Sequence, residues 1–306
     1  MPHRSDVVIP VAYVLFGILL LDLMAVIIRI LSDSYPTAQL AALRNLFGMV
    51  PSLVLLYASA EWTAGGRRFA IRQWPLGFLR GVLVTAAQMC FYIALLHLDF
   101  ATVGTLVYAS PLIVTALSVP LLGERVGIWR WTAVVIGFAG IVLIMRPGTD
   151  AFTLAALLPL GAAAGYASSS VLVRRIDTDV PSPLVNLYAT FAAMVCASLI
   201  MLATATPVWF ASWQDALLIF VMGCSGGTGV LFLIFGYRRA TPSVIAPFEY
   251  TGILIAFALG WFFFGEAPID TLFPGVLLIV GAGLLIVWRE RRVKGKVEGP
   301  PVRTRR

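Results

Sequence analysis

Five charged side chains interrupt long apolar stretches of the sequence, where bulk water cannot reach them. They are Asp22, Arg29, Arg44, Arg80 and Glu249. A charge inside a lipid bilayer costs about 2.5–3.5 kcal/mol on insertion scales, so each instance needs a partner, an escape to the surface or a function. The chemistry that such residues offer is the binding of charged groups or of protons.

Glu249 is the strongest candidate for a binding residue. No lysine or arginine shares its apolar stretch, and Pro247 precedes it by two residues. Proline lacks a backbone N–H and clashes with the preceding helical turn. Pro247 is therefore expected to kink its helix, as is Pro111 in an earlier stretch. We expect Glu249 to bind a cationic group of a solute, or a proton exchanged for it, with a hydrogen-bonded structural acid as the alternative.

Asp22 and Arg44 lie at similar depths in the first two apolar stretches, about 13 Å and about 10 Å from the same end by helical rise. Since a short hairpin joins these stretches, the two side chains can meet, and a pair would offset the cost of desolvating each charge. We interpret them as a clamp between two helices, an external gate or part of a solute site. Arg29 and Arg80 lie nearer to helix ends, where a long side chain is expected to reach the lipid headgroups.

Aromatic and amide side chains could complete a cavity around the acid. Gln88 and Tyr92 are four residues apart, so they share one face of a helix. Tyr108 and Tyr250 occupy matching positions in two similar stretches. Because aromatic ring faces attract cations, a cage of tyrosines with one acid suits an amine. The alternative is that these side chains only pack the helices together.

These residues must be positioned by helices that cross a membrane. Hydrophobic residues make up 60% of the chain and charged residues only 12%, against roughly a quarter charged in soluble domains. Crossing about 30 Å of hydrocarbon takes roughly 20 helical residues. Stretches of this kind are expected at 8–31, 38–57, 75–96, 101–121, 129–146, 152–173, 184–205, 213–236, 243–264 and 271–288.

The two halves of the chain repeat each other. Residues 101–124 align with residues 243–266, and the Gly-Glu pair that ends at Glu124 recurs at Glu266. Each repeat therefore contains five helices, and an odd number of helices inverts the second copy in the membrane. Inverted repeats with a binding site near the bilayer midplane are typical of secondary transporters.

The expected fold is all-α, with ten transmembrane helices arranged as two inverted five-helix repeats. The first repeat is expected at residues 1–149 and the second at residues 150–290. A basic tail follows at residues 291–306, which contains most of the eight lysines and arginines that lie from Arg289 to the end of the chain.

The distribution of positive charge predicts the orientation. The chain has a net charge of +7 and 22 lysines and arginines. With both termini in the cytoplasm, 18 of these lie on the inner side and only Arg146 lies on the outer side. Such a bias is typical of bacterial inner-membrane proteins. The basic tail has no interleaved aromatic residues, so we expect it to be solvated and do not expect a nucleic-acid partner.

Cysteines and histidines do not form a metal or cofactor site in the sequence. Cys90, Cys196 and Cys224 are widely spaced within apolar stretches and are expected to pack as small hydrophobic residues. His3 lies in the N-terminal tail and His97 lies at a helix end, which excludes a histidine cluster. No cofactor and no metal are therefore expected.

Enzymatic activity inside the membrane has little support. Both lysines, Lys294 and Lys296, lie in the tail, so a Ser-Lys dyad at depth is excluded, and no histidine lies at depth either. A GxxxxGK[ST] loop for binding ATP is absent from the sequence as well. The chain is therefore not expected to be an enzyme or an ATP-driven pump.

The sequence resembles the EamA-type ten-helix carriers of the drug/metabolite transporter superfamily, over roughly residues 8–290. The motifs that carry the resemblance are Asp22…Arg29, Tyr35-Pro36…Arg44, Ala109-Ser110-Pro111…Gly123-Glu124 and Pro247-Phe248-Glu249-Tyr250…Gly265-Glu266. The resemblance implies a five-plus-five fold and a role in transport. It leaves the substrate open, because the superfamily handles amino acids, amines, nucleotide-like metabolites, drugs and sugars.

The expected function is secondary transport by alternating access, coupled to protons or to exchange. A cationic or zwitterionic amine, amino acid or nucleoside-like compound is favoured, because the deepest lone charge is negative. A flippase for a lipid-linked substrate is the alternative. The expected partners are the small-molecule substrate and the lipid bilayer, and the sequence leaves open whether the chain forms a homodimer.

Overall fold

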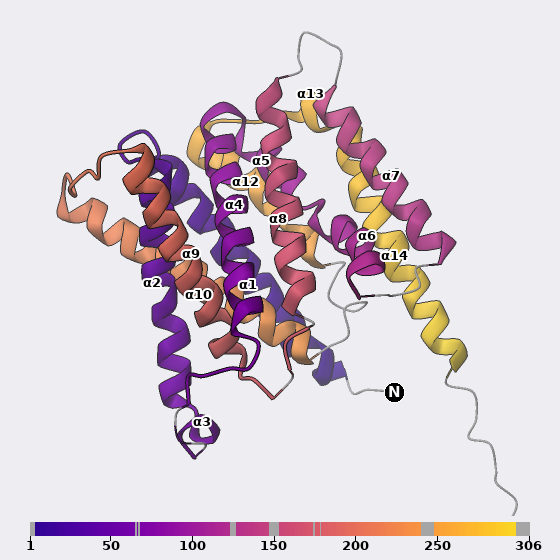
Figure 1. The fold of residues 1–306 in the computed structure, drawn as a ribbon. Helices are drawn as coiled ribbons and strands as arrows, with labels where there is room; N and C mark the ends of the chain where they lie inside the picture. Colours follow the sequence, from indigo (N-terminus) through magenta and orange to yellow (C-terminus); the bar gives the residue numbers. More distant parts are fainter. Residues whose placement is uncertain are drawn as a thin grey trace, which may run out of the picture.

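The computed structural model describes residues 4–64, 66, 68–122, 127–146, 153–173, 175–177, 179–239 and 248–297, and these residues form a bundle of helices (Figure 1). Seven helical segments of the described chain are long and apolar enough to cross a membrane, counting the interrupted segment Phe100–Leu121 as one. Three shorter apolar helices complete the set, at Trp131–Met145, Thr251–Phe264 and Gly275–Leu285. The fold is therefore all-helical, as expected.

The helices follow one another with short connections. In the first half they are α1 (Arg4–Leu31), α2 (Thr37–Ala58), α3 (Ala60–Ala64), α4 (Trp74–His97), α5 (Phe100–Val107), α6 (Ser110–Leu122) and α7 (Ile128–Met145). In the second half they are the 3-10 turn η1 (Leu154–Ala156), α8 (Leu157–Val173), α9 (Ser182–Thr204), α10 (Trp213–Arg239), α12 (Thr251–Phe264), α13 (Ile269–Leu272) and α14 (Gly275–Val297).

The fourth membrane segment is interrupted. We expected one continuous helix over residues 101–121, but α5 ends at Val107 and α6 begins at Ser110. Pro111 occupies the first turn of α6, a position where its missing N–H leaves no hydrogen bond unmade. In the second repeat, Tyr250 lies in a turn directly before α12. Tyr108 and Tyr250 thus both occupy helix interruptions, whereas Pro247 lies outside the described residues.

Packing between the two halves follows a two-fold pattern. Helix α1 packs along α10, and α8, the counterpart of α1, packs along α4, the counterpart of α10. In the same way α2 packs on α10, while α9 packs on α4. The counterparts α2 and α9 also pack on each other, as do α7 and α14. This exchange of partners is what two copies related by a two-fold axis in the membrane plane produce.

The two ends of the bundle can be named by the ends of α1. The C-terminal ends of α1, α4 and α12 lie at the Leu31 end, together with α13 (Figure 1). The start of α1 at Arg4 and the C-terminal part of α14 lie at the other end, which we call the Arg4 end (Figure 1). Arg146 donates to the backbone carbonyl of Asp270 at the Leu31 end, which joins the end of α7 to α13.

Glycines allow the closest helix contacts. A Cβ added to Gly227 of α10 would collide with the backbone of Gly48 in α2, and one added to Gly275 of α14 would collide with the backbone of Gly140 in α7. Small residues let helix backbones approach in a membrane, where the lipid gives no hydrophobic drive for helix association. These contacts hold the two repeats together around the polar residues described next.

Candidate functional site

Asp22 is a buried carboxylate on α1, with only 8% of its surface exposed. The hydroxyl of Tyr108 lies 3.3 Å from each of its two carboxylate oxygens and donates a hydrogen bond to them. Because Tyr108 lies between α5 and α6, the interrupted segment presents its hydroxyl to α1. Among the described residues, Asp22 forms no ion pair with a lysine or arginine.

Glu249 lies near the same tyrosine. It is half-buried. The charges of Glu249 and Asp22 both act on the Tyr108 hydroxyl through electrostatic repulsion of its ionised form. Tyr250, the next residue, is buried and also lies within range of the Glu249 charge. We call Asp22, Tyr108, Glu249 and Tyr250 the acidic cluster.

Two glycines make room for the tyrosines of the acidic cluster. A Cβ added to Gly252 of α12 would collide with the hydroxyl and ring of Tyr108. A Cβ added to Gly283 of α14 would collide in the same way with the ring of Tyr250. The tyrosines therefore lie directly on helix backbone, which restricts their movement.

Arg44 is the centre of a second group, on α2, and only 5% of its surface is exposed. Its Nη1 donates to the Oδ1 of Asn45 at 3.0 Å, and its Nε donates to the Sδ of Met24 at 3.4 Å. Asn45 and Gln88 of α4 exchange two hydrogen bonds between their amides, of 2.7 Å and 3.3 Å. Every polar contact of the Arg44 guanidinium in the described part of the chain is thus with a neutral group.

Tyr92 adds a hydroxyl to this second group. It lies one turn after Gln88 on α4, and only 1% of its surface is exposed. Its hydroxyl has no hydrogen-bond partner among the described residues. Tyr92 lies within electrostatic range of Arg44, as does Tyr166 of α8. We call Arg44, Asn45, Gln88 and Tyr92 the basic cluster.

The ion pair that we expected between Asp22 and Arg44 is not formed. Arg44 contacts Met24 on α1, which lies two residues after Asp22 and therefore about 200° around the helix, at about 100° per residue. Asp22 and Arg44 consequently lie on opposite faces of α1. The expected pairing was wrong, because depth along the helices was considered without their rotation. A role of either residue in a gate or in a solute site remains a prediction.

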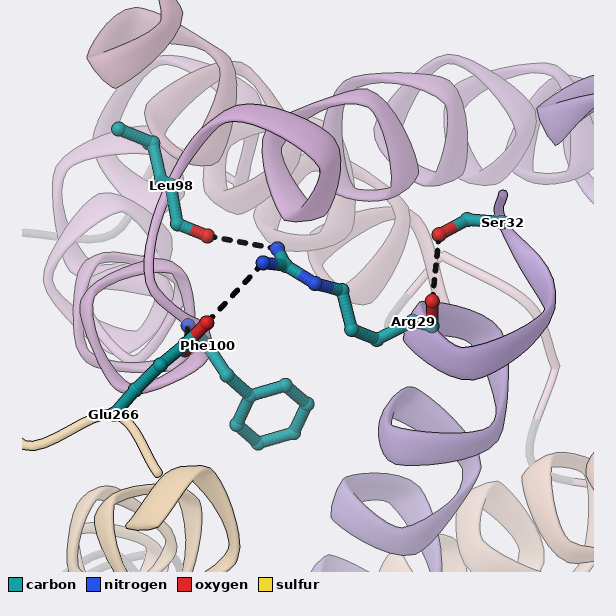
Figure 2. Close-up of polar contacts among 5 residues, drawn as sticks. All are labelled: Arg29, Ser32, Leu98, Phe100 and Glu266. Atoms are coloured by element: carbon teal, nitrogen blue, oxygen red, sulfur yellow. Dashed lines mark hydrogen bonds and ion pairs between the residues drawn. The ribbon is translucent and has the colours of Figure 1, made fainter. Parts of the chain in front are cut away.

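An ion pair occurs instead at the Leu31 end. The Nη2 of Arg29 lies 3.2 Å from the Oε1 of Glu266, and the Nη1 of Arg29 donates to the carbonyl of Leu98 at 2.9 Å (Figure 2). The other carboxylate oxygen of Glu266 accepts the backbone N–H of Phe100 at 2.7 Å. The Arg29 guanidinium also lies 5.7 Å from the centre of the Phe264 ring.

We call Arg29, Leu98, Phe100 and Glu266 the latch. Figure 2 shows that it joins the end of α1 to the α4–α5 connection and to the segment after α12. The expectation that Arg29 reaches the headgroups was wrong, because Glu266 lies within its reach. The signal that could have found this pair was the predicted topology, which places the ends of the first and ninth segments on the same side.

Arg80 is also buried and does not reach the headgroups. Its Nε donates to the carbonyl of Ser169 at 3.0 Å, and its Nη1 lies 3.4 Å from the carbonyl of Val185. Only 7% of its surface is exposed. The side chain therefore joins α4 to α8 and α9 through backbone carbonyls, so the expectation of an escape to the surface was wrong here too.

Two surface pockets lie away from the acidic and basic clusters. One is at the Arg4 end and is lined by residues that include Arg72 and Asp177. The other lies between α2 and α9 and is lined mainly by apolar residues that include Leu46 and Met201. Neither of these two pockets contains a residue of the acidic or basic cluster, and Asp22, Arg44 and Tyr92 are buried in this conformation.

Known proteins resemble this chain over most of its length. The EamA-like transporter family model matches residues 8–146 and 153–288. An S-adenosylmethionine uptake transporter of Rickettsia felis is 25% identical over 220 residues, which cover 71% of this chain and 73% of that protein. A riboflavin transporter of Rhizobium johnstonii is 32% identical over 193 residues, which cover 62% of this chain and 63% of the other.

Two further comparisons extend over more of the chain. A pseudopaline exporter of Pseudomonas aeruginosa is 24% identical over 262 residues, which cover 85% of this chain and 89% of that protein. A solved crystal structure shares the fold with a TM-score of 0.63 at 20% identity, over 92% of this chain and 99% of the other. The chain therefore belongs to the EamA-like transporter family of the drug/metabolite transporter superfamily, and it is a membrane transporter, not an enzyme.

Proposed function

We propose that this protein is a secondary carrier for a small metabolite with a positively charged group, which it moves across the bacterial inner membrane by alternating access. The observation that carries the proposal is the buried Asp22 carboxylate, which is hydrogen-bonded to Tyr108 at a helix interruption. A charge at such a depth is costly and is typically retained in membrane proteins for binding or relay. A cationic solute group or a proton would supply the missing positive charge.

The location of the acidic cluster supports this role. It combines residues of α1 with residues at the interruption in each repeat, Tyr108 and Tyr250. Transporters built from inverted repeats place their sites where such interrupted helices meet. Movement of one repeat against the other would therefore change the access to Asp22 and Glu249 while the site stays near the centre. We propose residues 1–149 and 150–290 as the two moving units.

The latch would close one of the two access routes. With both termini in the cytoplasm, as the charge bias favours, the Leu31 end faces outward. The Arg29–Glu266 pair then joins α1 to the segment after α12 on the outer side. Opening to that side requires these two elements to separate, which breaks the ion pair and the hydrogen bond from the Phe100 amide.

The names of the relatives support a metabolite as the cargo without defining the direction. One is named for uptake of S-adenosylmethionine and another for export of pseudopaline. S-adenosylmethionine carries positive charge, which suits the acidic cluster, so it is a sensible first compound to test. The gradient of the solute or of protons would drive transport.

The test is counterflow of radiolabelled amines, amino acids and nucleoside-like metabolites, beginning with S-adenosylmethionine, into vesicles that contain the purified protein. We expect Asp22→Asn and Glu249→Gln to lower the rate about 10- to 100-fold, because a hydrogen bond to a charged group is worth about 1.5–3 kcal/mol. Asp33→Asn is the matched control, because Asp33 is exposed in the α1–α2 connection. Wild-type rates in both cluster variants would remove the acidic cluster from the mechanism.

A further inference from the structure

Arg44 is a buried cation that the described residues do not neutralise. Its two polar contacts, with Met24 and Asn45, are with neutral atoms. The one ion pair found in the described part of the chain is between Arg29 and Glu266. Taking a guanidinium out of water without a counter-ion carries a heavy penalty, because its hydration is lost and nothing of opposite charge replaces it. Arg80 is also buried without a counter-ion among the described residues, but its guanidinium donates to two backbone carbonyls, whereas none of the polar contacts that Arg44 makes with these residues is with a carbonyl of the backbone.

A hydroxyl near Arg44 lacks a hydrogen-bond partner in the described part of the chain. The Tyr92 hydroxyl is buried and has no acceptor in the described residues, although a buried hydroxyl normally has one. Tyr92 and Met24 belong to the same packed core, and Arg44 contacts Met24 directly. A guanidinium without a counter-ion and a hydroxyl without an acceptor among the described residues therefore lie in the same packed core. What this region lacks is a negatively charged acceptor.

The surroundings hold the Arg44 guanidinium in place. Asn45 is fully buried, and its amide also donates to the Ala41 carbonyl at 2.8 Å while it exchanges hydrogen bonds with Gln88. The Asn45 oxygen is thereby held toward Arg44. A Cβ added to Gly226 of α10 would lie 2.8 Å from the Nε of Arg44 and 2.9 Å from its Nη2. The glycine thus leaves the space that the guanidinium occupies, and these contacts preorganise the basic cluster.

We propose that Arg44 and Tyr92 form a carboxylate-binding subsite, so that the transported metabolite carries a carboxylate in addition to its positive group. A planar guanidinium can bind a carboxylate through two parallel hydrogen bonds. One buried guanidinium matches a single negative charge, which favours a carboxylate over a doubly charged phosphate. This inference rests on the proposed function, since a carrier must open a path by which the solute reaches the interior.

The acidic and basic clusters together fit a zwitterion. Asp22 and Arg44 lie on different faces of α1, with Asp22 toward Tyr108 and Met24 toward Arg44. A solute long enough to present a positive group to the acidic cluster and a carboxylate to the basic cluster would satisfy both sites without adding net charge to the interior. A purely cationic solute would leave Arg44 uncompensated.

The test measures thermal stabilisation of the detergent-purified full chain by matched compounds at equal concentration. The pairs are S-adenosylmethionine with its decarboxylated derivative, and each of a panel of L-amino acids with its amide. We expect the carboxylate member of at least one pair to stabilise the protein at about 10- to 100-fold lower concentration than its match, as a charge-assisted hydrogen bond predicts. Arg44→Gln should abolish this difference, and Tyr92→Phe should reduce it about 2- to 10-fold.

An internal carboxylate provides a sharper test. Asn45→Asp places a negative charge where the Asn45 oxygen now accepts from Arg44, so the protein would carry its own counter-ion. We expect this variant to lose its preference for carboxylates. Its melting temperature is not the readout, because an aspartate cannot donate to the Ala41 carbonyl and to Gln88 as the Asn45 amide does. Asn186→Asp is the matched control, since Asn186 is buried but donates to Ser52, which lies about two turns along α2 from Asn45. It should melt at a lower temperature and retain the preference.

Chloride and sulfate distinguish a carboxylate subsite from a general anion site. Equal stabilisation by these ions would overturn the proposal, as would a panel in which no carboxylate outperforms its match or an unchanged preference in Arg44→Gln. The proposed function is tested separately by counterflow. Transport that depends on Asp22 but accepts decarboxylated compounds equally well would refute the subsite alone, whereas Arg44-dependent binding without any transport would refute the carrier.

Discussion

The latch and the basic cluster each contain an arginine that is removed from bulk water, but their guanidinium groups have different surroundings. Arg29 is met by the Glu266 carboxylate and the Leu98 carbonyl. Arg44 is met by an amide oxygen and a thioether sulfur, and no carboxylate of the described chain pairs with it. Glu266 thus neutralises the charge of Arg29, whereas Arg44 has no counter-ion among the described residues.

The acidic cluster belongs with the basic cluster in this comparison. Asp22 receives a neutral hydroxyl from Tyr108 and forms no ion pair with the described lysines and arginines. The charge pair of the latch joins helices through an ion pair, and Arg80 joins helices through backbone carbonyls, whereas Asp22 and Arg44 have neither kind of partner among the described residues. The difference gives a physical criterion for separating structural from binding residues in this bundle, and the following variants challenge it.

The largest expected effect comes from removing both interior charges together. Asp22→Asn and Arg44→Gln should each lower transport about 10- to 100-fold, while thermal stability without substrate stays equal or rises because a costly buried charge is removed. If Asp22 and Arg44 interact only through a bound solute, the changes in the free energy of unfolding without solute should add in the double variant, within about 0.5 kcal/mol. Thermal melts and vesicle counterflow on the four proteins measure both quantities. A lower melting temperature in both single variants would show that these charges are structural.

Breaking the Arg29–Glu266 ion pair of the latch should lower the stability of the protein, whereas removing Asp22 or Arg44 should not. Glu266→Gln is expected to destabilise the closed Leu31 end by about 1.5–3 kcal/mol, because hydrogen bonds to a charged group are lost. The Phe100 amide donates to Glu266, so its hydrogen exchange should accelerate most. Mass-spectrometric exchange over the start of α5 measures this effect, with Asp270→Asn as the control because Asp270 is exposed at the same end. Unchanged exchange at Phe100 would contradict a holding role for the latch.

The tyrosine of the acidic cluster can be displaced without touching a charge. Gly252→Ala pushes a methyl group into the Tyr108 side chain, whereas a Cβ at Gly260 on the same helix would meet its nearest atom at 3.6 Å. We expect Gly252→Ala to raise the KM for transport about 3- to 10-fold through the weakened Asp22–Tyr108 hydrogen bonds. Gly260→Ala should transport normally. If both variants transport with the same KM, the contact of Tyr108 with Gly252 is not needed for substrate binding.

The smallest effect is expected far from both clusters. The Tyr35 hydroxyl donates to Asp215 at 2.7 Å and accepts the Ala211 N–H at 2.9 Å, which joins the α1–α2 connection to the start of α10. Tyr35→Phe should cost about 1–3 kcal/mol of stability with transport preserved. Tyr188→Phe, which loses an exposed hydrogen bond to the Phe69 carbonyl, should cost less. Thermal melts compare the two, and a transport defect in Tyr35→Phe at full stability would extend the functional region to this end.

Composition and periodicity were enough to predict the helical membrane fold. A chain that is 60% hydrophobic and 12% charged must place most of its residues in lipid or in helix contacts, and only helices satisfy the backbone there over such lengths. The alignment of residues 101–124 with residues 243–266 predicted two inverted copies, and the family match confirms the two-repeat architecture. The prediction that Glu249 binds a solute or a proton remains a proposal.

Only the tertiary structure decided which charges meet. The depths of Asp22 and Arg44 along their helices suggested a pair, but the rotation of α1 directs Asp22 toward Tyr108 and presents Met24 to Arg44. The actual pair, Arg29 with Glu266, joins residues 237 positions apart. Helix rotation and partner choice depend on side chains packed from distant helices, and a single sequence contains no direct record of those contacts. Hydrophobicity acts locally along the chain and can be read from it, whereas pairing of buried charges is a property of the packed bundle.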